Sequence, residues 1–325
     1  MIEIPEAFVR GTVDREGERG RRWADTLPEL VTRLVEQWGC VADGPVVHGE
    51  VGVVVPVLHD RGPAVVKVSF PHPGNVWEPD AFEAWRGRGA VRLYAREDEC
   101  FAMLLERAGG RTLAELRRGD EVVTIAGQLN RRLAVPAPPG LPRLREQMAQ
   151  WERSLQRDAA EFADALPRHV VEEAAATVRE LGSDQPELVI HGDLHARNIL
   201  GAQREPWLVV DPKGLVGDPA YDGGTFLKAH VFALLEEDDL ERAVTRCVGM
   251  FAAAAGLERE RVRRWTQFRA VESAFWRRRH RFRRAGGGAT PDRLTALADH
   301  LAEMLAPRRP ARRPPALPRS AASGW

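Results

Sequence analysis

The sequence predicts an α+β protein with two lobes, a small antiparallel sheet followed by a mainly helical region. Two patterns lead to this prediction. Short β-branched runs separated by turn residues occupy residues 46–107, and apolar residues at helical spacing fill most of residues 112–285. The chain of 325 residues is also long enough for two lobes that each bury a core.

The first lobe is expected to span residues 1–107. An amphipathic helix is predicted over residues 21–39, where Trp23, Leu27, Leu30, Leu34 and Trp38 recur at helical spacing. Three strands follow in "PVVHGEVGVVVPVLHDRGPAVVKVSF", with turns at residues 49–52 and 60–63. A short helix toward residue 85 and two more strands, in "GAVRLYARED" and "CFAMLLERAGG", complete this antiparallel lobe.

The second lobe is expected to span residues 108–306. Helices are predicted at about 112–134, 143–165, 168–182, 220–236, 238–255 and 258–285, interrupted by one polar loop and a hairpin. Residues 307–325, rich in Pro and Arg, cannot build a core, and the composition predicts a disordered tail.

Composition narrows the range of functions. Basic and acidic residues balance at 47 each, which argues against a general binder of polyanions. Three widely spaced cysteines, Cys40, Cys100 and Cys247, fit neither a disulfide framework nor metal-ligand spacing and favour a reducing compartment. No signal core or membrane span is evident. We therefore expect a soluble cytoplasmic protein with no membrane partner and no obligate protein partner.

The segment "VIHGDLHARNIL", residues 189–200, concentrates polar groups between two apolar ends. In the hairpin that follows, a turn centred on residues 204 and 205 places Asn198 opposite Asp211. Together with Asp193, one loop away, these oxygen donors predict a site for Mg²⁺ carrying phosphates. The alternative is that Asp193 and Asn198 only cap turns.

A cation for the phosphates is available in the sheet lobe. Lys67 stands among valines in "AVVKVSF", in a chain whose basic residues are otherwise nearly all Arg. Lys is disfavoured inside strands, so this position predicts a phosphate-pairing ammonium, with an edge-strand position as the alternative. Gly49 and Gly52, in the upstream turn, are predicted to offer backbone N–H groups to a phosphate.

These segments resemble a known family. "HGDLHARN" followed by "VVDPKG" is similar to the catalytic loop and metal-binding segment of aminoglycoside and choline kinase-type phosphotransferases, which have the protein-kinase-like fold. "REPWLVVDPKGLVGDPAYD", "AWRGRGAVRLY" and "LNRRLAVPAPPGL" resemble the streptomycin 6-kinase branch, which is grouped with hydroxyurea phosphotransferases. The resemblance covers residues 1 to about 306.

The resemblance implies a role for each matching residue and implies ATP and Mg²⁺ as cofactors. Asp193 corresponds to the catalytic base, Asn198 and Asp211 to the Mg²⁺ ligands, and Lys67 to the phosphate-pairing lysine. Glu106, in "LLER", belongs to the hinge whose backbone holds the nucleobase. His191 corresponds to a brace of the loop, and Asp218 and Asp222 to a segment that supports the site from beneath.

Other points stay open at the level of the sequence. The glutamate partner of Lys67 is either Glu78 or Glu83. The resemblance implies a small-molecule aminoglycoside acceptor, namely the 6-hydroxyl of streptomycin, and Lys228 stands where that acceptor is expected. The alternatives are hydroxyurea, a sugar or an amino alcohol as acceptor, or a nucleotide-binding pseudoenzyme. ATP and GTP are not distinguished.

Two charged segments have competing interpretations. Residues 236–239, "EEDD", could form an acidic rim for a cationic acceptor, or a helix end followed by an Asp N-cap. Residues 276–284, "WRRRHRFRR", and the tail could bind nucleic acid, or form a charged helix face and a soluble tail. Balanced overall charge favours the charged helix face and the soluble tail over nucleic-acid binding, so no nucleic-acid partner is expected.

Overall fold

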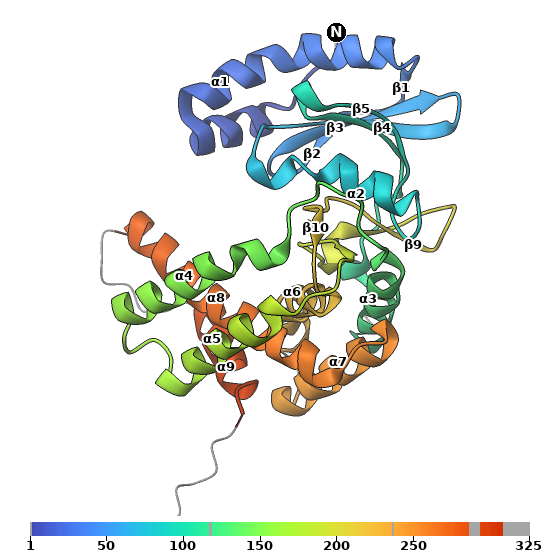
Figure 1. Ribbon diagram of the computed structural model, residues 1–325. Coiled ribbons are helices and arrows are strands. Elements are labelled where there is room, and N and C mark those ends of the chain that lie inside the picture. Colours follow the sequence, from blue (N-terminus) through green and yellow to red (C-terminus); the bar gives the residue numbers. More distant parts are fainter. Residues whose placement is uncertain (1, 117–118, 236, 286–292, 308–325) are drawn as a thin grey trace, which may run out of the picture.

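The structure is a computed structural model, and it describes residues 2–116, 119–235, 237–285 and 293–307, with the side chains of residues 281–285 left out (Figure 1). A sheet lobe lies above a larger helical lobe in the view of Figure 1. None of the helices in these ranges is both long and apolar enough to cross a membrane.

The sheet lobe contains β1 (Val41–Ala42), β2 (Val47–His48), β3 (Gly52–His59), β4 (Gly62–Ser69), β5 (Leu93–Glu97) and β6 (Ala102–Glu106). The strand order is β1-β3-β4-β6-β5, with β2 also paired to β3, and every pairing is antiparallel. The predicted antiparallel strands are confirmed. The tight turn between β3 and β4 leaves two residues between the paired His59 and Gly62, and Gly62 has a φ of 105°.

Helix α1 (Glu6–Gln37) covers the outer face of the sheet (Figure 1). Its buried residues Leu27, Val31 and Leu34 pack into one cluster with Val53 and Val55 of β3. The helix begins at Glu6, well before the predicted residue 21, so the predicted start of this helix was wrong. The glycines of residues 11–20 lower helix propensity, and Gly17 breaks the helix with a φ of 62°, yet tertiary packing keeps both halves helical.

Helix α2 (Glu78–Trp85) is the short helix predicted before the last two strands. Pro79 stands in its first turn, where the missing N–H is tolerated. Phe82 and Trp85 are buried, and the indole Nε1 of Trp85 donates to the carbonyl of Leu133, 2.8 Å away in the helical lobe. The helix therefore attaches the sheet lobe to the helical lobe.

The helical lobe contains α3 (Gly119–Leu133), α4 (Met148–Glu161), α5 (Arg168–Ser183), α6 (Pro219–His230), α7 (Leu240–Ala255), α8 (Arg259–Ala285) and α9 (Arg293–Met304). Three predicted helices are shorter than expected, because 3-10 turns occupy one of their ends: Leu113–Glu115, Leu144–Gln147 and Val231–Leu234. Helix α9 was not predicted. Its buried Leu297 and Leu301 pack against the core of this lobe.

Helix α6 is almost entirely buried at the centre of the helical lobe, with α4, α5, α8 and α9 to one side and α3 and α7 to the other (Figure 1). Two small antiparallel pairs lie above it, β7 (Val189–Ile190) with β10 (Leu215–Val216) and β8 (Ile199–Gly201) with β9 (Trp207–Val209). The core of this lobe continues into residues 81–105. The predicted division at residue 107 stays a prediction, as does the tail, whose residues 308–325 lie outside the described ranges.

Candidate active site

The side chain of Lys67 is buried on β4, where it lies between two carboxylates. Its Nζ is 2.5 Å from Oε1 of Glu78 and 2.6 Å from Oδ1 of Asp211. Burial alone would lower the pKa of Lys67, but the charges of Asp211 and Glu78 outweigh it and raise that pKa above the ordinary value. The charge of Lys67 lowers the pKa of Asp211, whereas burial raises the pKa of Glu78. The two carboxylates therefore favour the charged form of Lys67.

The geometry distinguishes the two candidate partners of Lys67. Glu78, the first residue of α2, is 3% exposed and contacts Lys67 directly. Glu83 lies on the exposed side of the same helix, and its carboxylate is 3.3 Å from Arg96. The neighbouring Pro79 does not disrupt the arrangement, since it occupies the first turn of α2.

The segment around Asp193 connects β7 to a 3-10 turn at Ala196–Asn198. The buried carboxylate of Asp222, on α6, accepts hydrogen bonds from the backbone N–H groups of His191 and Gly192, at 2.7 and 2.8 Å. Ring Nε2 of His191 lies 2.9 Å from the carbonyl of Val210, and burial lowers the pKa of His191 to about 4. A neutral imidazole thus donates to this carbonyl and ties the loop to the hairpin.

Asp218 holds the start of α6 in place. Its Oδ1 accepts from the N–H of Ala220 at 2.9 Å, as a helix N-cap does. Its Oδ2 accepts from the indole of Trp265 at 2.6 Å and from the guanidinium of Arg261 at 2.5 Å. Because Asp222 lies in the first turn of the same helix, this network also positions the loop that carries Asp193.

The hairpin register differs from the predicted one. Ile199 pairs with Val209 and Gly201 with Trp207, so Asn198 faces Val210, and its carbonyl accepts from the N–H of Val210 at 2.9 Å. The prediction that Asn198 lies opposite Asp211 was wrong by one residue. A loop of residues 202–206 joins the strands, and its odd length excludes the even turn that the prediction assumed.

Asn198 and Asp211 each keep one side-chain oxygen that no hydrogen bond within the described ranges uses, and their role as metal ligands stays a prediction. The Nδ2 of Asn198 donates to the backbone carbonyl of Asp193 at 3.1 Å, which turns its oxygen Oδ1 the other way. Asp211 follows the hairpin with a φ of 59°, and Lys67 engages only its Oδ1. One amide oxygen and one carboxylate oxygen are left as hard donors, which suits an ion that takes its other ligands from phosphates and water.

Two predicted nucleotide contacts have other roles in the structure. The N–H of Glu106 donates to the carbonyl of Arg92 at 2.8 Å, and its carboxylate accepts from Arg204 at 2.8 Å. A Cβ at Gly52 would lie 2.8 Å from the carbonyl of Val68, so strand packing explains this glycine. At Gly49, a Cβ would meet no atom within 4 Å. Nucleotide contacts by Glu106, Gly49 and Gly52 stay predictions.

Arg204 is a residue that the sequence analysis missed. Besides Glu106, its guanidinium reaches the carbonyls of Gly87 and Ala90, at 2.9 and 2.8 Å, and the carboxylate of Glu205 at 2.6 Å. It thereby joins the hairpin loop to the edge of the sheet lobe. The only signal in the sequence was its place in the hairpin turn, where an exposed charge is commonplace.

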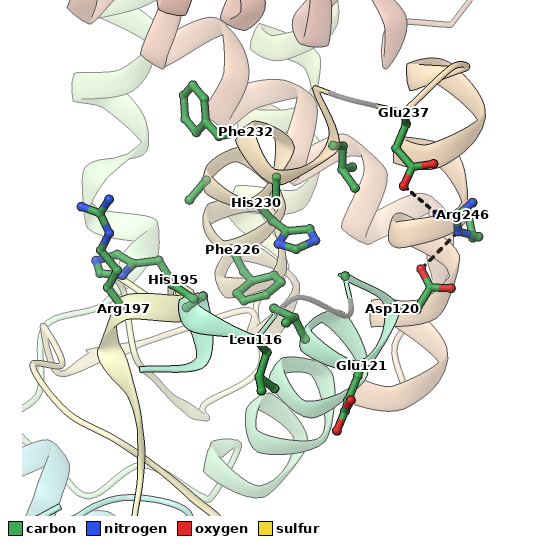
Figure 2. A pocket seen from close by; sticks show the side chains of 17 residues that line it. Leu116, Asp120, Glu121, His195, Arg197, Phe226, His230, Phe232, Glu237 and Arg246 are labelled. Atoms are coloured by element: carbon green, nitrogen blue, oxygen red, sulfur yellow. Dashed lines mark hydrogen bonds and ion pairs between the residues drawn. The ribbon is translucent and has the colours of Figure 1, made fainter. Parts of the chain in front are cut away.

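A cavity of about 1080 Å³ opens beside the loop that carries Asp193 (Figure 2). His195 and Arg197 of the loop line it, together with aromatic residues at the end of α6. Figure 2 shows Arg246 between two acidic residues of the rim, 3.3 Å from Asp120 and 4.0 Å from Glu237.

The predicted acidic rim is only partly at this cavity. Glu237 lines it, whereas Asp239 accepts from the N–H of Arg242 at 2.9 Å as the N-cap of α7. Residue 236 lies outside the described ranges.

The basic segment that begins at Trp276 is largely engaged within the protein. Arg278 makes a bidentate pair with Asp299 of α9, at 2.7 Å for both bonds. Arg279 pairs with Asp158 of α4, and the guanidinium of Arg277 lies over the ring of Phe232. The indole of Trp276 is 58% exposed. The charged helix face is thus also a packing face; the side chains of residues 281–284 lie outside the described set.

The two lobes and this site define a phosphotransferase of the protein-kinase-like class. The sheet lobe presents a buried Lys–Glu pair, and the loop below it presents Asp193 and Asn198 beside Asp211. A choline/ethanolamine kinase family protein from Mesorhizobium loti has the same fold, with a TM-score of 0.57 and 16% identity over 85% of this chain and 93% of that one.

The chain belongs to the family described as aminoglycoside/hydroxyurea antibiotic resistance kinase, whose pattern matches residues 37–280. Streptomycin 6-kinase from Streptomyces griseus is 37% identical over 278 residues, which are 85% of this chain and 91% of that protein. Hydroxyurea phosphotransferase from Kitasatospora aureofaciens is 34% identical over 306 residues, 93% of this chain and 86% of that protein. The protein is therefore a phosphotransferase with an alcohol group as acceptor.

Proposed function

We propose that the protein transfers the γ-phosphoryl group of ATP, in the presence of Mg²⁺, to a hydroxyl group of an aminoglycoside, namely the 6-hydroxyl of streptomycin. The observation that carries this proposal is the convergence of four chemical groups at one place. The ammonium of Lys67 lies 2.6 Å from Asp211, and Asn198 is hydrogen-bonded to the backbone of Asp193.

Each residue has a task that phosphoryl transfer requires. Asp193 accepts the proton of the acceptor hydroxyl and directs its oxygen at the phosphorus. Lys67, held by Glu78, pairs with the phosphates of the nucleotide. Asn198 and Asp211 would hold Mg²⁺, which neutralises charge on the phosphates when it is bound. The reaction is mainly one of positioning and charge neutralisation, so the hydrogen bonds that the loop donates to Asp222 contribute to the rate by fixing geometry.

The names of the relatives support the acceptor. Two curated streptomycin 6-kinases align with 85% of the chain, and phosphorylation of the antibiotic would inactivate it. Hydroxyurea is the second candidate, because the hydroxyurea phosphotransferase aligns with 93% of the chain. The three cysteines are free thiols, which supports a reducing, cytoplasmic location.

The test is release of ADP from ATP with Mg²⁺, measured with streptomycin, hydroxyurea, a second aminoglycoside, choline and no acceptor in parallel. We expect stimulation by streptomycin and a phosphorylated product whose mass rises by one phosphoryl group. Stimulation by hydroxyurea alone would select the second candidate. Nucleotide binding without turnover for any acceptor would contradict the proposal and favour a pseudoenzyme.

A further inference from the structure

A second cavity, of about 410 Å³, lies between α4, α6 and α8. Aromatic side chains of α4 and α8, Trp151 and Trp276 among them, form part of its wall. Lys228 is the residue that α6 contributes. Since Lys228 and Tyr221 are roughly two helical turns apart, they share one face of α6. The ring of Tyr221 contacts Trp151 of α4 and the guanidinium of Arg269 of α8, so this face of α6 points toward the cavity.

Lys228 lies within the electrostatic reach of Asp193. The negative charge of Asp193 acts on Lys228, on Arg269 and on Tyr221, so the carboxylate lies close to this end of the cavity. Among the described residues, however, no carboxylate is within 4.0 Å of the ammonium of Lys228, and no cation is within 4.0 Å of the carboxylate of Asp193. The two opposite charges are therefore close enough to act on each other without forming an ion pair.

Both carboxylates of this cavity, and the guanidinium groups next to them, are already paired. Glu272 pairs with Arg269, and Asp158 pairs with Arg157 at 3.1 Å and with Arg279. The ionisable groups that face Lys228 from the elements around it are Tyr221 on α6, Asp193 and His195 in the loop, Asp158 on α4, and Arg269, Glu272 and Arg277 on α8. Within the described ranges, Lys228 and Arg277 are the cations of this group without a carboxylate within 4.0 Å, and the guanidinium of Arg277 lies instead over the ring of Phe232.

The surroundings oppose a positive charge at this place. Burial, together with the positive charge of Arg269, lowers the pKa of Lys228 to about 8, although Asp193 acts in the opposite direction. An arriving cation would meet the same low dielectric and the same like charges. Guanidinium groups, such as those of streptomycin, stay protonated at every pH at which the protein is folded.

We propose that Lys228 selects acceptors by charge: its protonated ammonium opposes an acceptor that carries a cation beside the reacting hydroxyl, and this opposition ends when Lys228 loses its proton. The inference rests on the proposed function, because it assigns the cavity between α4, α6 and α8 to the acceptor of that reaction. Lys228 is a specificity-determining residue in this account and takes no part in the transfer itself.

The test compares the wild type with Lys228→Met and Lys228→Arg. Streptomycin binding is measured by calorimetry in the presence of ADP between pH 6.5 and 9.5, and KM values for streptomycin and ATP are measured over the same range. Arg153→Met, which removes one exposed charge from α4 outside the cavity, is the control. Thermal unfolding of each variant shows that it is folded.

Each variant has a distinct expected result. The wild type should bind streptomycin about tenfold more tightly above pH 8 than well below it, because the like charge disappears. Lys228→Met should bind tightly across the range, and Lys228→Arg weakly across the range. The KM for ATP should be the same in all variants, and Arg153→Met should follow the wild type. If Lys228 only supported the fold, its substitution would change the KM for streptomycin and the KM for ATP together.

The inference and the proposed function can fail separately. Streptomycin turnover by the wild type with an unchanged pH profile in Lys228→Met would overturn the inference and leave the function standing. Binding that follows the three predicted profiles without any turnover would support the inference and overturn streptomycin as the acceptor. Equal affinity of all variants at each pH, or no binding by any of them, would overturn the inference.

Discussion

Glu78 and Glu83 are both glutamates of α2, yet only Glu78 reaches Lys67. The difference is helical geometry, because residues five positions apart point to different sides of a helix. Glu78 faces the sheet, where its carboxylate contacts the ammonium that pairs with the nucleotide phosphates in the proposed reaction. Glu83 faces solvent and touches the site at no point.

Glu78→Gln should lower kcat/KM for ATP by about 10²-fold, because Lys67 loses the charge that positions it. Glu83→Gln is the matched control on the same helix and should leave kcat/KM within about twofold of the wild type. Steady-state kinetics at saturating acceptor measure both variants. Equal activity of Glu78→Gln and Glu83→Gln would show that Glu78 has no role in the active site.

The buried His191 makes stability depend on pH on the acid side. Its folded pKa of about 4 lies below the value of about 6.5 that it has in an unfolded chain, so the unfolded state binds the proton first. The stability that the neutral imidazole contributes is fully present above pH 6.5 and is lost as the pH falls toward 4. Burial raises the pKa of Asp222 to about 7, and this group changes stability in the opposite direction over an overlapping range.

A comparison of the wild type with His191→Gln isolates the effect of the histidine on stability, since both proteins contain Asp222. Gln can still donate to the carbonyl of Val210 but does not titrate. Between pH 6.5 and 4 the variant should lose about 3 kcal/mol less unfolding free energy than the wild type. Urea denaturation at several pH values measures the difference. Parallel pH profiles of the two proteins would show that His191 is not buried in its neutral form.

At the level of elements, Arg204 connects the hairpin loop to the sheet lobe through Glu106 and the carbonyls of Gly87 and Ala90. Arg204→Ala should lower the unfolding free energy by about 3 kcal/mol, since it leaves a partly buried carboxylate without its partner. Arg204→Lys should restore only part of this loss, because one ammonium cannot reproduce the planar fork of a guanidinium.

Arg88→Ala is the control for this prediction. Arg88 is exposed on the neighbouring turn, and its removal should change the unfolding free energy by no more than about 0.5 kcal/mol. Thermal unfolding of the three variants against the wild type gives the comparison. A loss in Arg88→Ala as large as that in Arg204→Ala would show that the contacts of Arg204 are not the cause.

Several elements could be predicted from local patterns, and others could not. The strands β3 and β4 followed from their alternating valines and the two turns that bound them. The hairpin register did not follow, because the sequence does not show whether the loop between β8 and β9 has an odd or an even length. Helix α9 was missed although Thr, Pro and Asp precede it, and its burial depends on packing against α8, which local spacing does not show.

The candidate site was predictable as a set of residues and less so as a geometry. Asp193, Asn198, Asp211 and Lys67 all carry a local signal, and the structure brings them together. The choice of Glu78 over Glu83, and the positions of Arg204 and Lys228, depend on contacts between distant segments. No spacing along the chain encodes these contacts.

At the scale of the whole molecule, the Pro- and Arg-rich composition of residues 308–325 predicts that the enzyme does not need them. Leu305 and Ala306 are still buried, and residues 308–325 lie beyond them. Truncation after Pro307 should leave the melting temperature and the turnover number unchanged. Loss of activity after this truncation would contradict this prediction and show that the tail contributes to the reaction.

Truncation after residue 292 is the contrasting change. It removes α9, with the buried Leu297 and Leu301 and the pair between Arg278 and Asp299. Each lost leucine costs about 2 to 5 kcal/mol, so this shorter chain should unfold at a far lower temperature or aggregate. Circular dichroism and size-exclusion chromatography of both truncated chains make the comparison.

The central claim is that the two lobes form an active phosphotransferase whose catalytic base is Asp193. The most direct test is streptomycin-stimulated, Mg²⁺-dependent release of ADP by the wild type and by Asp193→Asn. We expect turnover in the wild type and a loss of about 10²- to 10⁴-fold in kcat in the variant, with nucleotide binding retained. Turnover that survives in Asp193→Asn at the rate of the wild type would contradict this claim.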